Sequence, residues 1–471
     1  MSTQQQLIDG LRITGTVLDK IVADKPAQIA QLQERYPADE IIKGLAPSQR
    51  SMYDALSGDN ASYILECKKA SPSKGLIRDD FNLNEICGAY QHYAAAVSVL
   101  TDETYFQGAF EYVKEVRQLL SQPIINKDFF IDQYQIHLAR YMGADAILLM
   151  LSVLDDDKYR ELAAVAATFE MDILTEVSNE EELARAIELD AKIIGINNRD
   201  LRDLSIDLNT TKLFAPKIGS DRIVISESGI STHQQIAELA PFADGFLVGS
   251  SLMSQPDLDL ACRELIYGHT KICGLTDNAT AHGVAAAGAV YGGLIFAPNS
   301  PRYVTPEHAK QVKENVNLKF VGVFVNEPID NLVAIANELD LDVVQLHGSE
   351  DNDYINALRE LLPNTQIWQA CRSDKLNDVD TTQADRLLID SAVVNDHSVQ
   401  FGGTGESFDW ELVPQSLKQQ AMLAGGLTPD NIKLAAHSGF MGLDVNSGVE
   451  TSPGVKDLVK IKQLMQQIRQ Y

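Results

Sequence analysis

Charged side chains stand at the ends of several short apolar runs in the first half of the sequence. The run 62–67 contains Glu66 and is followed by Lys68, and later runs carry Lys127 and Glu176. Because residues two apart on a strand point to the same side, Glu66 and Lys68 are expected to lie together. Lysine and carboxylate groups gathered in this way can act as general acids and bases. The alternative is a set of ion pairs without function, which would be costly to bury.

Polar loops after the later runs of this half add a candidate anion site. Asn197, Asn198 and Arg199 end one run. The loops SESGI (226–230) and LVGSSL (247–252) offer backbone N–H groups of Gly and Ser ahead of a helix, an arrangement that cradles phosphate. On a chain with a formal charge of −27, a local group of cations predicts a small anionic substrate.

The second half has its own candidate pair, Cys273 and Asp390, each at the end of an apolar run. A buried cysteine is more often a small core residue than a base, and a single histidine such as His347 is more often structural. If the thiol ionises near neutral pH, however, Cys273 and Asp390 can divide the roles of general base and general acid. Arg302 follows a neighbouring run and adds a cation.

Glycine-rich loops repeat the phosphate pattern in this half. LAGGL (423–427) and DVNSGVE (444–450) are similar to the two loops of the first half, and GGTG (402–405) predicts a flexible loop near Asp390. Phosphosugar chemistry is therefore expected in both halves.

The sequence has no metal or nucleotide signature. Asp155, Asp156 and Asp157 stand ahead of a helical pattern, where capping and the helix dipole explain them better than Mg²⁺ does. The run DNATAHGVAAAGA (277–289) predicts a helix of small residues rather than a nucleotide loop. The five cysteines are widely spaced with no C-x-x-C pair, which predicts neither a disulfide framework nor a zinc site.

The composition is typical of a folded globular protein, with 45% hydrophobic and 22% charged residues. The chain of 471 residues has 66 acidic and 39 basic side chains, a balance that argues against nucleic-acid partners and against anionic membranes. The N-terminus lacks the pattern of a signal peptide, and no apolar run reaches the roughly 20 residues of a membrane span. A cytoplasmic protein is expected.

Alternating strands and helices must position these residues. Eight near-continuous apolar runs, typical of strands buried on both faces, alternate with helical patterns as far as about residue 265. These runs span residues 62–67, 97–101, 123–129, 145–151, 171–177, 192–198, 222–228 and 244–249. A second set of eight spans residues 271–275, 292–297, 319–325, 342–347, 366–371, 386–390, 421–425 and 442–446.

The count predicts an α/β fold of two tandem (β/α)₈ TIM barrels, the first with an extra N-terminal helical segment over residues 1–60. An open doubly wound sheet also alternates strands and helices, but the repeated count of eight and the lack of a G-x-G-x-x-G turn favour barrels. A junction near Tyr267 predicts domains of residues 1–267 and 268–471 with almost no linker. In such barrels reactive groups lie at the carboxyl ends of the strands, and the last two strand loops commonly bind phosphate.

Seven motifs in each half, in order, resemble those of two enzyme families. The first half resembles indole-3-glycerol phosphate synthase over residues 1–265 in LECKKASPSKG, SVLTDETYFQG, INKDF, LTEVSNEEE, GINNRDL, ISESGI and LVGSSL. The second half resembles phosphoribosylanthranilate isomerase from about residue 268 onward in KICGLT, GGLIFAPNSPRYV, VQLHG, LLIDS, GGTGESFDW, LAGGL and GLDVNSGVE. The whole chain is similar to the bacterial fusion of these two enzymes of tryptophan biosynthesis.

The resemblance implies that the second half acts first. It would convert N-(5-phosphoribosyl)anthranilate to 1-(2-carboxyphenylamino)-1-deoxyribulose 5-phosphate by an Amadori rearrangement. By this resemblance Asp390 protonates the ring oxygen of the ribose, and Cys273, as a thiolate, removes the C2′ proton. Arg302 would hold the anthranilate carboxylate, with His347 nearby. The implied phosphate contacts are Gly425, Gly426, Ser447 and Gly448.

The resemblance implies that the first half then closes the indole ring and releases CO₂ and water. Lys127 would be the acid at the C2′ carbonyl oxygen and Glu176 the base, assisted by Glu66 and by Lys68. Whether Lys68 is a second acid or an anion anchor stays open. The implied substrate-orienting residues are Asn197, Arg199 and Ser228, with Phe106 and Phe129 lining the anthranilate slot. The implied phosphate and anion contacts are Ser71, Gly229, Gly249 and Ser250.

Neither reaction requires a cofactor or a metal, and the implied partners are small phosphosugar–anthranilate substrates, with no obligatory protein partner and a monomeric chain. One alternative is an active barrel joined to an inactive one, against which the acid and base positions of both halves argue. A second is a phosphosugar-binding regulator, which would not need Lys127, Glu176, Cys273 and Asp390 together. A third alternative is another phosphosugar isomerase, which would lack the Glu-x-Lys pair and would not divide the roles of base and acid between a cysteine and an aspartate.

Overall fold

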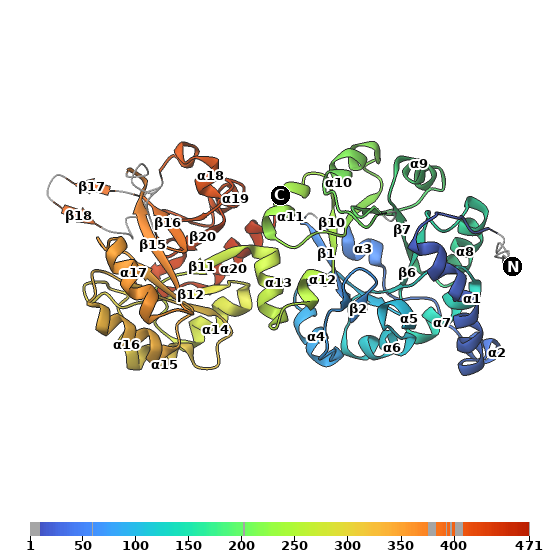
Figure 1. Ribbon diagram of the computed structural model, residues 1–471, viewed down its shortest axis with the longest axis horizontal. Helices are drawn as coiled ribbons and strands as arrows, with labels where there is room; N and C mark the ends of the chain where they lie inside the picture. Colours follow the sequence, from blue (N-terminus) through green and yellow to red (C-terminus); the bar gives the residue numbers. More distant parts are fainter. Residues whose placement is uncertain are drawn as a thin grey trace. The chain divides into compact units, whose positions relative to one another are not determined.

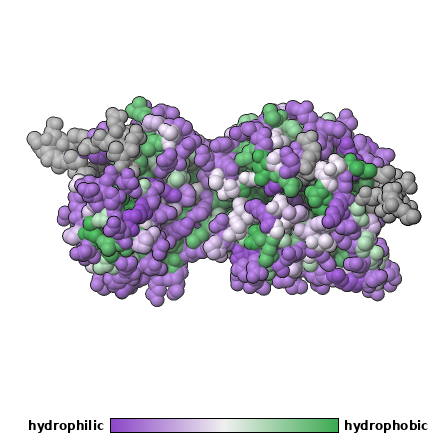
Figure 2. All heavy atoms as spheres, in the orientation of Figure 1, coloured by the Kyte–Doolittle hydropathy of each residue, from purple (hydrophilic) through white to green (hydrophobic). Residues whose placement is uncertain are grey.

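The computed structural model describes residues 10–58, 60–200, 203–374, 383–391, 393–395, 398–400 and 408–470. The chain divides into two compact units, Met1–Ser231 with Gln235–Cys262 and Thr232–Gln234 with Arg263–Tyr471. Each unit contains one closed barrel of parallel strands (Figure 1). The visible face of each unit is mostly hydrophilic, with apolar residues in scattered patches (Figure 2).

Eight parallel strands form the barrel of the first unit. They are β1 (Ser62–Cys67), β4 (Ala96–Leu100), β5 (Ile124–Lys127), β6 (Ala146–Met150), β7 (Asp172–Val177), β8 (Ile193–Asn197), β9 (Ile223–Glu227) and β10 (Gly245–Val248). The barrel closes where β1 pairs with β10, with Ser62 opposite Gly245. Most strand residues are buried on both faces, because side chains fill the barrel inside and helices cover it outside.

Helices follow these strands in the chain and bury one apolar stripe each. They are α4 (Leu83–Tyr90), α6 (Phe110–Leu119), α7 (Gln133–Met142), α8 (Asp156–Thr168), α9 (Glu180–Glu188), α10 (Asn209–Phe214), α11 (His233–Leu239) and α13 (Leu258–Tyr267), with the short α5 (Glu103–Phe106), η1 (Ala215–Lys217) and α12 (Ser250–Met253). The side chain of Asp155 caps α8 by accepting from the backbone N–H of Lys158, which confirms the capping role predicted for this acidic run. Ahead of the barrel lie α1 (Val17–Arg35), α2 (Ala38–Ile41) and α3 (Met52–Leu56), which confirms the helical N-terminal segment.

The second unit repeats the architecture with a second closed barrel. Its strands are β11 (His269–Ile272), β12 (Tyr291–Ile295), β13 (Lys319–Phe324), β14 (Val343–Leu346), β15 (Gln366–Arg372), β16 (Arg386–Asp390), β19 (Ala421–Leu423) and β20 (Gly442–Val445). Its helices are α14 (Asn278–Ala287), α15 (Pro306–Lys313), α16 (Ile329–Leu339), α17 (Asn352–Leu361), α18 (Gln415–Lys418), α19 (Ile432–Ala436) and α20 (Leu458–Ile468), with η3 (Trp410–Leu412) and η4 (Ser447–Val449). The small-residue run after Asp277 is the helix α14, as predicted.

Every predicted strand is present, and the two closed barrels exclude the open doubly wound sheet. Three small hairpins were not predicted, because strands of two or three residues are too short to show a period. They are β2 (Ala70–Ser71) with β3 (Gly75–Leu76), β17 (Val393–Asn395) with β18 (Ser398–Gln400), and β21 (Glu450–Ser452) with β22 (Val455–Lys456). The predicted loop 402–405 lies outside the described residues. Within the described ranges, no helix is long and apolar enough to cross a membrane.

Candidate active sites

A cavity of about 360 Å³ opens in the first unit at the carboxyl ends of the barrel strands. Each site residue predicted for this half lines it. These residues are Glu66, Lys68, Ser71, Phe106, Lys127, Phe129, Glu176, Asn197, Arg199, Ser228, Gly229, Gly249 and Ser250. The barrel thus brings together side chains that are separated by as many as 184 positions in the sequence, counted from Glu66 to Ser250.

Two lysines and two glutamates form an ionic network at this cavity, in which Glu66, Lys68 and Lys127 line the cavity and Glu227 is buried behind them. Glu66 Oε1 accepts from Lys68 Nζ at 2.9 Å, and Glu66 Oε2 lies 3.2 Å from Lys127 Nζ. The ammonium of Lys127 also lies 3.2 Å from Glu227 Oε2. Burial acts to raise the pKa of Glu66, but Lys127 and Lys68 hold it at about 2. Burial acts to lower the pKa of Lys127, but Glu66 and Glu227 raise it well above its ordinary value, so this lysine is charged and can donate a proton or a hydrogen bond.

Glu176 is the carboxylate of this cavity that can exchange a proton near neutral pH. Its burial and the neighbouring Glu227 raise its pKa to about 7, although Lys127 and a hydrogen bond from Asn197 act in the opposite direction. Asn197 Nδ2 donates to Glu176 Oε1 at 3.0 Å. A carboxyl group with a pKa close to the working pH suits a general base. Lys127 and Glu176 therefore provide an acid and a base at one barrel mouth.

Two glycines leave room for the carboxylates of this network. A Cβ at Gly249 would stand 2.4 Å from Glu66 Oε1, and a Cβ at Gly195 would stand 2.0 Å from Glu227 Oε1. Both distances are shorter than real contacts, so any larger residue would displace the carboxylate. Gly249 was predicted as a phosphate contact, and the structure adds that its missing side chain makes space for Glu66.

The anion loops of the first half have the backbone shape that their residues suggest. Ser228 and Gly229 both have positive φ, 67° and 84°, which turns the chain sharply after β9. Asn198 Nδ2 donates to the carbonyl oxygens of Glu227 and Ser228 and so holds this turn. Arg199 donates to the carbonyl oxygen of Leu204 at 2.8 Å.

Helix α1 contributes to this site, which sequence reasoning missed. Val17, Leu18 and Ile21 line the cavity from this helix. Lys25, with 2% of its surface exposed, forms ion pairs with Asp102 and Asp128. Nothing in the local sequence pairs a helical lysine with two acids about 80 and 100 positions away.

Those two acids hold the aromatic walls of the slot. Asp102 caps α5, the helix that ends with Phe106, and Asp128 accepts from the backbone N–H of Phe129. The rings of Phe106 and Phe129 have centroids 6.2 Å apart. The side chain of Lys25 thus ties α1 to the two segments that carry the predicted aromatic slot.

In the second unit, Cys273 follows β11 directly, and its sulfur accepts a hydrogen bond from a buried lysine. Lys271 Nζ donates to Cys273 Sγ at 3.2 Å, to Gln345 Oε1 at 2.9 Å and to Asp444 Oδ2 at 2.8 Å. Burial raises the pKa of the Cys273 thiol, and Lys271 opposes that shift without cancelling it. The predicted role of Cys273 as a base requires its thiol to ionise near neutral pH. Burial opposes that ionisation and Lys271 favours it, a balance that the sequence could not show because it does not reveal how deeply the sulfur is buried.

Asp390 ends β16, and its carboxyl group has a raised pKa. Burial and the charge of Asp444 raise its pKa to about 6. Its Oδ2 atom lies 3.7 Å from His347 Nε2, and burial lowers the pKa of His347 to about 4, so this histidine is neutral. Gly425, with φ of 85°, lies so close that a Cβ there would stand 2.7 Å from Asp390 Oδ1. Asp390 and Gly425, a glycine of the predicted phosphate loop, therefore lie side by side at the carboxyl ends of the strands.

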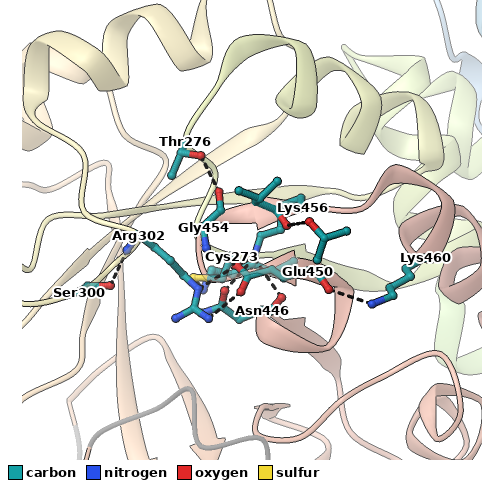
Figure 3. A network of polar contacts seen from close by, with 12 residues as sticks. Cys273, Thr276, Ser300, Arg302, Asn446, Glu450, Gly454, Lys456 and Lys460 are labelled. Atoms are coloured by element: carbon teal, nitrogen blue, oxygen red, sulfur yellow. Dashed lines mark hydrogen bonds and ion pairs between the residues drawn. The ribbon is translucent and has the colours of Figure 1, made fainter.

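Arg302 lies near Cys273 in a network of polar contacts (Figure 3). Its Nε atom donates to Glu450 Oε1 at 2.8 Å and its Nη2 atom to Glu450 Oε2 at 2.7 Å. Lys456 Nζ donates to the same carboxylate at 2.7 Å and to Asn446 Oδ1 at 2.8 Å. The hairpin of β21 and β22 therefore fixes the guanidinium. Sequence reasoning noted Glu450 only as the end of the loop 444–450 and did not find Lys456, because nothing local pairs either residue with Arg302.

The remaining predicted loop residues of this half follow β19 and β20. Gly426 has φ of 64°, and Ser447 and Gly448 lie in η4. A Cβ at Gly448 would stand 1.9 Å from the carbonyl oxygen of Leu427, so these two loops pack backbone to backbone. In the part of the chain that the structure describes, no group of His, Cys, Asp and Glu is arranged to hold a metal ion.

Comparison with known proteins gives a match for each barrel. The family model of indole-3-glycerol phosphate synthase matches residues 18–265, and that of N-(5′-phosphoribosyl)anthranilate (PRA) isomerase matches residues 270–467. The tryptophan biosynthesis protein TrpCF of Yersinia pestis is 52% identical over 463 residues, 97% of this chain and 95% of that protein. The protein of the same name from Salmonella typhi is 52% identical over 458 residues, 97% of this chain and 100% of that protein.

A solved phosphoribosylanthranilate isomerase from Thermotoga maritima is 29% identical and covers 43% of this chain and 99% of its own, with a TM-score of 0.38. The two family matches divide the chain as its two barrels do, and the relatives match it over nearly its whole length. The chain therefore belongs to the fused indole-3-glycerol phosphate synthase and phosphoribosylanthranilate isomerase family, and it is a bifunctional enzyme of tryptophan biosynthesis with a decarboxylating lyase barrel followed by an isomerase barrel.

Proposed function

We propose that the two barrels act in succession through the residues predicted from the sequence, with the domains divided as residues 1–267 and 268–471. The isomerase barrel converts N-(5-phosphoribosyl)anthranilate to 1-(2-carboxyphenylamino)-1-deoxyribulose 5-phosphate, and the lyase barrel converts that product to indole-3-glycerol phosphate. The observation that carries the proposal is the acid and base pair in each barrel, Asp390 with Cys273 and Lys127 with Glu176.

In the isomerase barrel Asp390 gives its proton to the ring oxygen of the ribose, which opens the furanose to a Schiff base. Cys273 then removes the C2′ proton, and the resulting enolamine tautomerises to the ketone. The pKa of Asp390, about 6, lies close enough to neutral pH for this carboxyl group to donate a proton during the reaction. His347 is neutral and accepts from Gln345 Nε2 at its Nδ1 atom, so its Nε2 atom, which faces Asp390, carries the proton and can donate a hydrogen bond.

Arg302 binds the anthranilate carboxylate through the donors that Glu450 leaves available. Glu450 takes the Nε atom and one donor of Nη2, so Nη1 and the second Nη2 hydrogen remain for a substrate anion. The phosphate binds at the loops of Gly425, Gly426, Ser447 and Gly448, whose backbone N–H groups follow β19 and β20.

In the lyase barrel Lys127 donates to the C2′ carbonyl oxygen while the ring carbon of the anthranilate attacks C2′. Loss of CO₂ restores the aromatic ring, and loss of the hydroxyl as water then needs a proton donor and an acceptor. Lys127 and Glu176 supply these, with Glu66 and Lys68 holding the charges in place.

The other predicted residues bind and orient the substrate. Phe106 and Phe129 form the anthranilate slot, Asn197, Arg199 and Ser228 orient the polar groups, and Ser71, Gly229, Gly249 and Ser250 bind the phosphate. We propose that neither reaction uses a cofactor or a metal, since the acids and bases named above account for each proton transfer. We propose a cytoplasmic enzyme whose partners are its small phosphosugar–anthranilate substrates.

The test adds freshly made N-(5-phosphoribosyl)anthranilate to the purified chain and follows its fluorescence together with the appearance of the indole product. The wild-type protein is expected to form the indole product. Lys127→Met is expected to consume the substrate and accumulate the carboxyphenylamino intermediate. Asp390→Asn is expected to leave the substrate intact yet still convert supplied intermediate. The proposal fails if the substrate decays no faster than in buffer and supplied intermediate is not consumed.

A further inference from the structure

Lys271 is a fully buried lysine at the centre of the isomerase barrel. Its exposed fraction is 0%, and it lies on β11 two residues before Cys273. An ammonium group has three N–H donors, and the three acceptors within reach are Cys273 Sγ, Gln345 Oε1 and Asp444 Oδ2. The lysine therefore has no donor left for a substrate and can act on the reaction through these neighbours.

The geometry defines what Lys271 does to the sulfur. A sulfur that receives a hydrogen bond from an ammonium at 3.2 Å is held in one position, and its negative charge is stabilised when the proton leaves. The opposite charge of Asp444 offsets the cost of burying the lysine. Gln345 has no charge and fixes the direction of the third donor.

We propose that Lys271 is a positioning residue of the isomerase reaction, which orients the sulfur of Cys273 toward the substrate and stabilises it as a thiolate when it acts as the base. The inference rests on the proposed role of Cys273 as the base. It assigns to Lys271 an effect on the ionisation of that residue, which a lysine that only fills the barrel would not have.

The charged groups around the sulfur come from several elements. Lys271 on β11 and Lys456 on β22 lower the pKa of Cys273, whereas Asp444 on β20 raises it. Arg302, which follows β12, also interacts with the charge of Cys273. Lys271 is the cation that touches the sulfur among the described residues, so its removal is expected to have the largest effect.

On the far side of the barrel stand His347 after β14 and Asp390 at the end of β16. His347 is neutral, so Asp390 is the acid that acts together with Cys273 in the proposed reaction. At pH values between the pKa of Asp390, about 6, and the higher pKa of the thiol, Asp390 and Cys273 together carry one proton. Most of the time that proton sits on the sulfur, whereas the reaction needs it on Asp390.

The difference between the two pKa values therefore limits the productive fraction of the enzyme. An opposite charge in contact lowers the pKa of an acidic group by about 1–3 units, so loss of Lys271 should widen the difference by that amount. The isomerase kcat/KM is then expected to fall about 10- to 1000-fold over the whole plateau of its pH profile. The alkaline limb, which reports the thiol, should move to higher pH.

The experiment compares Lys271→Met with Lys271→Arg in the full chain. The isomerase kcat/KM is measured against pH, and alkylation of Cys273 by iodoacetamide is followed against pH by peptide mass. Lys271→Met should lower the plateau and raise both the alkaline limb and the midpoint of alkylation. Lys271→Arg, which keeps the charge, should bring the alkylation midpoint back toward that of the wild type.

Two controls separate this effect from misfolding. Conversion of supplied intermediate by the lyase barrel of the same chain should be unchanged. Lys418→Met removes another buried lysine of this unit, on α18 away from the sulfur, and should leave the isomerase profile unchanged. If Lys271→Met does not fold because Asp444 loses its partner, the double variant Lys271→Met with Asp444→Asn removes both charges and still raises the alkylation midpoint.

The inference is overturned if Lys271→Met lowers activity while the alkaline limb and the alkylation midpoint stay where they are, since the lysine would then be structural. Full activity in Lys271→Met would also overturn it. Absence of isomerase activity in the wild-type chain is a different result, because it rejects the role proposed for Cys273 itself.

Discussion

Arg302 and Glu450 form a two-point ion pair near Cys273 in the isomerase barrel, with N–O distances of 2.8 and 2.7 Å. The two residues are 148 positions apart in the sequence. The pair holds the guanidinium in one plane and leaves it donors for one more carboxylate, which supports the proposal that Arg302 binds the anthranilate carboxylate.

Glu450→Gln should weaken binding of the isomerase substrate. The amide can accept one hydrogen bond from Arg302 but carries no charge, so the guanidinium is held less firmly. We expect KM for N-(5-phosphoribosyl)anthranilate to rise about tenfold, equivalent to about 1.4 kcal/mol, with a smaller change in kcat. Steady-state fluorescence kinetics measures both constants.

Glu338→Gln on α16, which removes the partner of the exposed Lys310, is the matched control and should leave both constants unchanged. An unchanged KM in Glu450→Gln would show that Arg302 does not depend on this pair.

Gly249→Ala should damage the lyase reaction selectively. The new methyl group would stand 2.4 Å from Glu66 Oε1, so the carboxylate must move away from Lys68 and Lys127. We expect the lyase kcat to fall at least about tenfold, because a small displacement of a charged network costs much of its catalytic effect. Isomerase activity of the same chain should not change.

Gly88→Ala on α4 serves as the control, since a Cβ there meets nothing within 4 Å. It should keep full lyase activity, with a slight gain in stability, because alanine favours a helix over glycine by about 1 kcal/mol. Equal lyase activities in the two variants would contradict the role given to Gly249.

The lyase reaction should lose activity as the pH falls through about 7, the pKa of Glu176. Glu176 acts as a base in its charged form, which is present above its pKa and is lost below it, so kcat should drop about tenfold for each unit of pH below about 7. Measurement of kcat with supplied intermediate from about pH 5 to about pH 9 gives the acid limb of the pH profile.

Asn197→Ala provides the companion variant for this titration. Asn197 donates to the charged carboxylate and so lowers the pKa of Glu176, and its loss should move the limb to higher pH. A limb that stays in place, or that moves to lower pH, would reject Glu176 as the group that titrates.

Lys25→Met should destabilise the first unit. It leaves Asp102 and Asp128 buried without their cation, which is expected to lower the free energy of unfolding by about 3–5 kcal/mol. The change is measured by urea unfolding that is monitored through the loss of lyase activity. The isomerase activity, measured in parallel, shows whether the second unit stays folded. Lys25→Met with Asp128→Asn should recover part of the loss, and no recovery would mean that charge is not the cause.

The sequence by itself determined the strands and the candidate catalytic groups. Burial on both faces of a parallel strand requires continuous apolar runs, so each barrel strand was visible locally, from 62–67 to 442–446. Strand ends carry the chemistry in such barrels, so Lys127, Glu176 and Asp390 could be selected by position alone. The small hairpins could not be predicted, because strands of two or three residues are too short to show an alternation of apolar and polar residues.

The tertiary structure alone decided which groups meet and how they ionise. Lys271 meets partners 74 and 173 positions away, and Lys25 reaches its acids from a helix that precedes the barrel. Such contacts have no local signal, since closure of the barrel creates them. Burial likewise depends on the whole fold, and for this reason only the structure shows that burial raises the pKa of Cys273 while Lys271 opposes that shift.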